Sequence, residues 1–143
     1  RRLVELDSNF YGGHFQVGRG LMNLKRYKAA VPELEKAAQY NYSSMTLRYL
    51  GLIYGLMGEN VKTREVLEEM ENLRSTQVEA NADFGAVYMA LGEFDNAFQY
   101  FEKAIKSHEG RMLNIKHAIR QFPEFEKDPR TKQLLEKIGL PYQ

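Results

Sequence analysis

The sequence contains no cysteine and no tryptophan among its 143 residues. Without cysteine, the protein can form neither a disulfide nor a thiolate metal site. Cysteine usage does not distinguish the cytoplasm from the periplasm, and we expect a cytoplasmic protein.

Long apolar runs and a large charge of one sign are also missing. No run approaches the roughly 18–20 apolar residues that span a bilayer, and we see no secretory signal at the first residues. The formal net charge is +1, with 27% charged residues of mixed sign. This balance argues against the basic stripe of a nucleic-acid-binding protein. We therefore expect no membrane and no nucleic-acid partner.

Glycine and proline are sparse, at 11 and 4 residues, whereas hydrophobic residues make up 43% of the chain. Most segments carry apolar residues at positions i, i+3, i+4 and i+7, which is typical of amphipathic helices. No segment alternates apolar and polar residues as a strand does. The patterns predict helices over 15–26, 27–38, 44–58, 61–73, 78–91, 94–107 and 112–122, with a short last helix starting at Asp128-Pro129.

A pattern of glycine, tyrosine, glycine and glutamate recurs after 34 residues: Gly51, Tyr54, Gly58 and Glu59 reappear as Gly85, Tyr88, Gly92 and Glu93. A fainter copy lies 33 residues earlier and begins at Gly18 and Leu21. Internal repetition at this period is typical of stacked supersecondary units rather than of a globule with one catalytic pocket.

Small residues recur at the places where two helices of a pair would meet. Gly18, Gly51 and Gly85 are expected to face the partner helix, which carries alanines at Ala30, Ala37, Ala97 and Ala104. Small residues let helix axes approach closely, so a Gly85→Leu change should overpack the contact at a cost of about 1–3 kcal/mol. We also expect Ser43 or Ser44 to cap a helix, and Gly58 and Gly92 to end one.

These residues resemble the tetratricopeptide repeat family. The third copy matches that family's pattern of glycine, aromatic and alanine positions: Phe84-Gly85, Tyr88, Gly92, Phe94, Ala97, Phe101 and Ala104. The second copy departs from it at Asn60, Thr63 and Met70, and the first has Lys25 where glycine is usual.

The resemblance implies an all-α fold, a right-handed superhelix of stacked antiparallel helix pairs. We expect repeats at 11–43, 44–77 and 78–111, a remnant of an earlier repeat at 1–10 and C-terminal capping helices at 112–143, all in one continuous domain. The first residues already read as helix, so we expect the C-terminal portion of a longer protein.

Catalytic and metal-binding patterns are not evident. The three histidines, His14, His108 and His117, are scattered and show no metal-ligand spacing. Gly12-Gly13 follows no strand and is not a phosphate loop. We expect neither a cofactor nor enzymatic activity, and set aside a third reading as an enzyme or small-molecule sensor.

A binding surface remains, because the first helix of each pair lines the concave side of such a stack. The residues expected to face this groove are Phe15, Arg19, Asn23, Arg48, Tyr49, Leu52, Glu79, Asp83, Lys116 and Arg120. Leu52, like Met22, could equally pack between repeats. Some family members hold a peptide's terminal carboxylate in a cationic cluster, but Glu79 and Asp83 would repel it here.

We consider two functions, the first from this surface and the second from the two ends of the chain. The first is a protein–protein interaction scaffold that binds a peptide or partner segment in the groove. The alternative is a regulatory or oligomerisation domain of a larger bacterial signalling protein, such as a transcription regulator, cyclase or kinase. The partner is thus expected to be a protein or peptide, with a homo-oligomer also possible.

Overall fold

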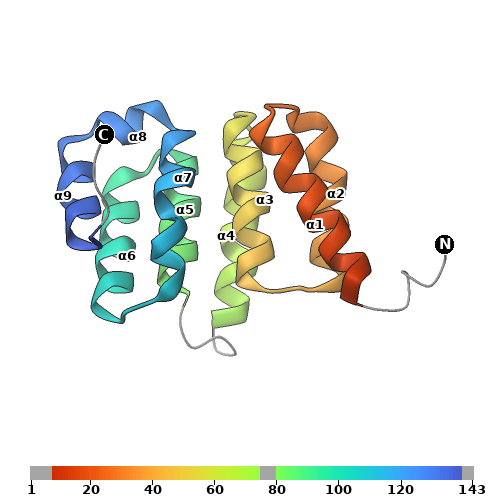
Figure 1. The fold of residues 1–143 in the computed structure, drawn as a ribbon, viewed down its shortest axis with the longest axis horizontal. Coiled ribbons are helices and arrows are strands. Elements are labelled where there is room, and N and C mark those ends of the chain that lie inside the picture. Colours follow the sequence, from red (N-terminus) through yellow and green to blue (C-terminus); the bar gives the residue numbers. More distant parts are fainter. Residues whose placement is uncertain (1–7, 75–79, 140–143) are drawn as a thin grey trace. The chain divides into compact units, whose positions relative to one another are not determined.

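The computed structural model describes residues 8–74 and 80–139, and the regular structure within those ranges is entirely helical (Figure 1). The chain divides into two compact units, Arg1–Leu73 and Arg74–Gln143. The prediction of an all-α fold built from successive packed helix pairs is confirmed.

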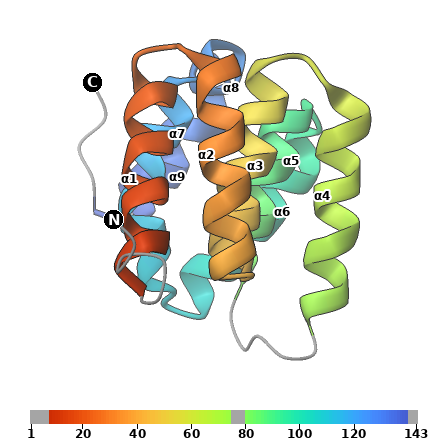
Figure 2. The same cartoon turned by 90° about the vertical axis from the view of Figure 1, so that its right-hand side faces the viewer.

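The first unit contains two helix pairs. α1 (Ser8–Asn23) packs against α2 (Tyr27–Tyr40), and α3 (Ser44–Leu56) packs against α4 (Asn60–Leu73). α2 also packs against α3, which joins the two pairs; α1 and α2 lie at the front in Figure 2. α1 starts at Ser8, so residues 8–10 belong to this helix. Residues 1–7, the rest of the expected remnant, lie outside the described residues.

The second unit contains one helix pair and a tail. α5 (Asn81–Leu91) packs against α6 (Phe94–Lys106), and the tail consists of the 3₁₀ helix η3 (Gly110–Asn114), α7 (Ile115–Arg120), α8 (Pro123–Lys127) and α9 (Pro129–Lys137). The prediction of one helix over 112–122 was wrong, because this segment changes from the 3₁₀ helix η3 to the α-helix α7 at Ile115, and α8 was not expected. The expected end of this segment before Pro123 is confirmed, because the residue before a proline avoids the helical conformation; Phe122 has φ −124° and ψ 85°.

Four helices, α1, α3, α5 and α6, end with the same backbone conformation. One residue adopts a left-handed conformation, with φ between +56° and +92°: Lys25, Gly58, Gly92 and His108. The next N–H then donates to the carbonyl five residues back, for example from Glu93 to Tyr88 at 3.0 Å and from Arg26 to Leu21 at 2.8 Å. The expected helix ends at Gly58 and Gly92 are confirmed. Lys25 and His108 adopt the same conformation despite their side chains.

Glycines allow the close approach of helices within each unit. A Cβ atom on Gly18 would lie 2.6 Å from Cδ2 of Leu34 on α2, and one on Gly85 would lie 2.6 Å from Cδ1 of Phe101 on α6. Both contacts are far inside van der Waals distance, so neither position accepts a side chain without movement. The expected role of these two glycines is confirmed.

Helix starts are capped in three ways. Ser43 and Thr46 form a reciprocal capping box at α3, as expected for Ser43. Asp128 accepts the backbone N–H of Arg130 at 2.9 Å and begins α9, as the Asp128-Pro129 pair predicts. The start of α5 is capped from a distance, because the buried Glu109 accepts the backbone N–H of Ala82 at 2.9 Å. Sequence reasoning did not single out Glu109.

Candidate functional site

In the first unit, α1 and α3 bring four of the predicted groove residues into one cluster. These residues, called here the Arg–aromatic cluster, are Phe15, Arg19, Arg48 and Tyr49. The rings of Phe15 and Tyr49 meet edge to face, with centroids 5.1 Å apart and planes at 89°. This geometry is favourable for two aromatic quadrupoles.

Two guanidinium groups complete the cluster. The Arg19 guanidinium lies 5.6 Å from the Phe15 centroid and 5.7 Å from the Tyr49 centroid. The Arg48 guanidinium lies 5.8 Å from the same Tyr49 ring. Phe15 and Arg19 are four residues apart on α1 and therefore share a face. Contacts of this kind contribute about 0.5–1 kcal/mol each at exposed sites.

Exposure separates the accessible members of the predicted groove from the buried ones. Phe15, Arg48 and Leu52 are buried, and so is Met22. Arg19 and Tyr49 are partly exposed, and Asn23 at the end of α1 is exposed. Of the predicted groove positions in this unit, a partner can therefore reach Arg19, Tyr49 and Asn23.

The predicted positions in the second unit are spread over different elements. Asp83 on α5 is fully buried. Lys116 on α7 is partly exposed, and Arg120 at the end of that helix is exposed. Glu79 lies outside the described residues.

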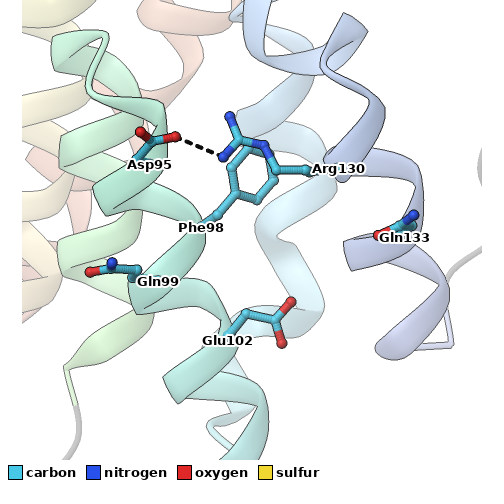
Figure 3. A pocket seen from close by; sticks show the side chains of 6 residues that line it. All are labelled: Asp95, Phe98, Gln99, Glu102, Arg130 and Gln133. Carbon is cyan, nitrogen blue, oxygen red and sulfur yellow. Dashed lines mark hydrogen bonds and ion pairs between the residues drawn. The ribbon is translucent and has the colours of Figure 1, made fainter.

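A hollow of about 460 Å³ lies between α6 and α9 in the second unit (Figure 3). Its lining residues are Asp95, Phe98, Gln99, Glu102, Arg130 and Gln133. Arg130 lies at one end, where its Nη1 donates to Oδ1 of Asp95 at 2.8 Å and its guanidinium sits 4.4 Å from the centroid of the Phe98 ring. None of these residues was predicted as a site residue.

The charged side chains that line this hollow form ion pairs. Arg130 also donates from Nη2 to Oδ2 of Asp128 at 2.9 Å, and Lys137 pairs with Glu102 at 2.9 Å. The hydrogen bonds from the Arg130 side chain hold the pKa of Asp128 below its usual value. The same bonds to Asp128, followed by those to Asp95, raise the pKa of Arg130. Because the charges are mutually satisfied and link α6 to α9, we read this region as the seam that holds the last helix in place.

Other chemical sites are not found in the part of the chain that the structure describes. Over residues 8–74 and 80–139, no three His, Asp or Glu side chains converge in a way that could hold a metal ion. None of the helices described there is long and apolar enough to cross a membrane.

Comparison with known proteins identifies one part of the chain. The family model described as tetratricopeptide repeat matches residues 78–108, which include α5 and α6. These residues therefore form a tetratricopeptide repeat, a type of protein–protein interaction module. No curated protein and no solved structure matches the chain at a significant level.

Proposed function

Because residues 78–108 form a tetratricopeptide repeat, we propose that this chain is a scaffold that binds a peptide segment of a partner protein. The contact surface that we assign lies on α1 and α3, around the exposed side of the Arg–aromatic cluster. The single observation that carries this assignment is Arg19, whose guanidinium lies over two rings and is partly exposed.

The chemistry of Arg19 indicates what the peptide contains. Within residues 8–74 and 80–139, Arg19 makes its ring contacts and forms no ion pair. A guanidinium held by rings but not by a carboxylate offers its donors to an incoming acid. Tyr49 beside it offers an apolar ring face and Asn23 a side-chain amide. The favoured ligand is therefore an extended peptide with an acidic side chain next to an aromatic or aliphatic one.

A peptide array with systematically varied acidic and aromatic positions tests this proposal. The strongest peptide is then titrated into the ¹⁵N-labelled chain, and we expect the amide signals of α1 and α3 to shift. Arg19→Glu should weaken binding at least tenfold, because it replaces attraction with repulsion. Lys28→Glu is the matched control, since this exposed lysine lies on α2 in the same unit. Equal affinity for folded Arg19→Glu and wild type would refute the assignment.

One observation favours the alternative of an oligomerisation domain. The side of α1 that faces away from the Arg–aromatic cluster is apolar and exposed.

A further inference from the structure

The outer face of α1 consists of four residues spaced four, three and four positions apart: Gly13, Val17, Gly20 and Leu24. This spacing places them on one side of the helix, with Leu24 directly after its last residue. Val17 is 50% exposed and Leu24 69% exposed. A Cβ atom on Gly13 or Gly20 would meet nothing within 4 Å. Within the described part of the chain, no packing contact therefore requires a glycine at either position.

The internal repeat indicates what covers a face of this kind. Aligning Gly18 with Gly51 pairs the four positions with Thr46, Leu50, Ile53 and Met57. Thr46, Leu50 and Ile53 are buried on α3. On the adjoining side of α3, Tyr54 donates from its hydroxyl to Oε2 of Glu35 on α2, at 2.9 Å. The equivalent face of α3 is therefore buried beside α2, whereas Val17 and Leu24 on α1 are exposed within the part of the chain that the structure describes.

The sizes of the side chains on α1 match a second copy of the same face. We consider an antiparallel pair of α1 helices related by a two-fold axis that passes midway between residues 13 and 24. Residues whose numbers sum to 37 then lie opposite each other. Val17 then faces the partner's Gly20, and Leu24 faces the partner's Gly13. Each large side chain meets a glycine, so the face is complementary to itself, as a two-fold interface requires.

Charge does not oppose this pairing. Between residues 12 and 24, the ionisable side chains are His14 and Arg19. Nδ1 of His14 lies 2.6 Å from Oε1 of Glu33 on α2, and the Arg19 guanidinium lies over the rings of Phe15 and Tyr49. Neither belongs to the outer face, so no like charges meet along it. The antiparallel arrangement also opposes the two helix dipoles favourably.

We propose that the chain forms a two-fold homodimer through the outer face of α1, with the two α1 helices antiparallel. One helix pair buries less than the ~1,200 Å² that a stable interface normally needs, so the dimer is weak and depends on concentration. The interface lies on the opposite side of α1 from Arg19 and leaves the proposed peptide surface open.

Sedimentation equilibrium of the full chain from about 10 μM to 1 mM tests the dimer. The average mass should rise from 16.6 kDa toward twice that value. Val17→Glu with Leu24→Glu should remain at the monomer mass over the whole range. Val61→Glu is the matched control, because this valine on α4 is 73% exposed and lies outside the interface; it should associate like wild type.

The register can be tested because the chain has no cysteine of its own. A mixture of Val17→Cys and Gly20→Cys chains should form a disulfide-linked dimer several-fold faster than Val17→Cys alone, since disulfides need closely opposed Cβ atoms. Val61→Cys should cross-link only at the slow rate of random collision.

Three results would overturn the proposal. One is a monomer at every concentration, which would mean that a different helix covers this face. Another is association that persists in a folded Val17→Glu, Leu24→Glu chain. The last is cross-linking through position 61 as fast as between positions 17 and 20. Circular dichroism establishes that each variant is folded.

Discussion

The ring of Phe101 lies where a side chain on Gly85 would have to be. A Cβ atom at Gly85 would stand 2.6 Å from both Cδ1 and Cε1 of that ring. This contact sets how closely α5 and α6 approach, within the segment that matches the tetratricopeptide repeat. A large side chain against a glycine is therefore a determinant of the helix pair, and it leads to the first prediction.

Gly85→Leu should destabilise the protein by about 1–3 kcal/mol, because the extra atoms force the Phe101 ring and the two helices apart. Urea unfolding followed by circular dichroism measures the change. Gly12→Ala is the control, since a Cβ atom there meets nothing within 4 Å. This helical alanine should instead stabilise by about 0.5–1 kcal/mol. A Gly85→Leu chain as stable as wild type would contradict the packing argument.

Lys25→Gly should stabilise the first helix pair by about 1 kcal/mol. Lys25 has φ +64°, a left-handed conformation in which a side chain is strained. The lysine is exposed, so little packing is lost on its removal. The reverse change, Gly92→Lys at φ +92°, should destabilise the α5–α6 turn. Thermal unfolding of both variants measures these effects, and shifts of the same sign would argue against strain as the cause.

Glu109→Ala should cost about 1–2 kcal/mol, because it removes the acceptor for the first N–H groups of α5. The Glu109 carboxylate accepts from the Ala82 backbone at 2.9 Å and from Nδ2 of Asn81 at 2.9 Å. Glu109→Gln keeps one oxygen acceptor and should lose less stability than alanine. Hydrogen exchange at Ala82 should speed up in the alanine variant, and unchanged protection there would rule out the cap.

The seam between α6 and α9 should weaken in acid through Asp128. Its folded pKa lies below the usual value of 3.8, because the Arg130 side chain donates hydrogen bonds to the carboxylate. A depressed pKa stabilises the fold above the unfolded pKa, and this contribution is lost as the pH falls through the folded pKa. The urea midpoint of wild type should therefore drop below about pH 4 by more than that of Asp128→Asn. Equal drops in the two proteins would contradict this role.

Local pattern was sufficient to predict the helix pairs. The apolar spacing, the glycines at positions 58 and 92 and the serine at position 43 act within a few residues of themselves, and the structure places helix ends beside each of them. The tail was harder, because the apolar pattern over 112–122 does not show that a 3₁₀ helix gives way to an α-helix at Ile115, and the short α8 has too few residues to show a period. The capping by Glu109 joins groups 27 and 28 residues apart, and no local pattern signals it.

The candidate site, too, was predictable from the sequence only in part. Sequence spacing alone put Phe15 and Arg19 on one helical face, and it put Arg48 and Tyr49 on another helix of the same kind. Only the packing of the first unit decided that Tyr49 meets Phe15 and that Arg19 lies over both rings. The burial of Arg48, Leu52 and Asp83 was also beyond sequence, since it depends on how each helix is rotated against its neighbours.

By itself the sequence determined the all-helical class, the repeat period and the ends of most helices, because these depend on backbone preference and hydrophobic spacing over one or two turns. The tertiary structure decided which side chains meet across helices and which remain accessible. The outer face of α1 is an example: its spacing resembles that of α3, but one face is buried and the other is open. Burial depends on which helices are neighbours, and no window of a few residues contains that information.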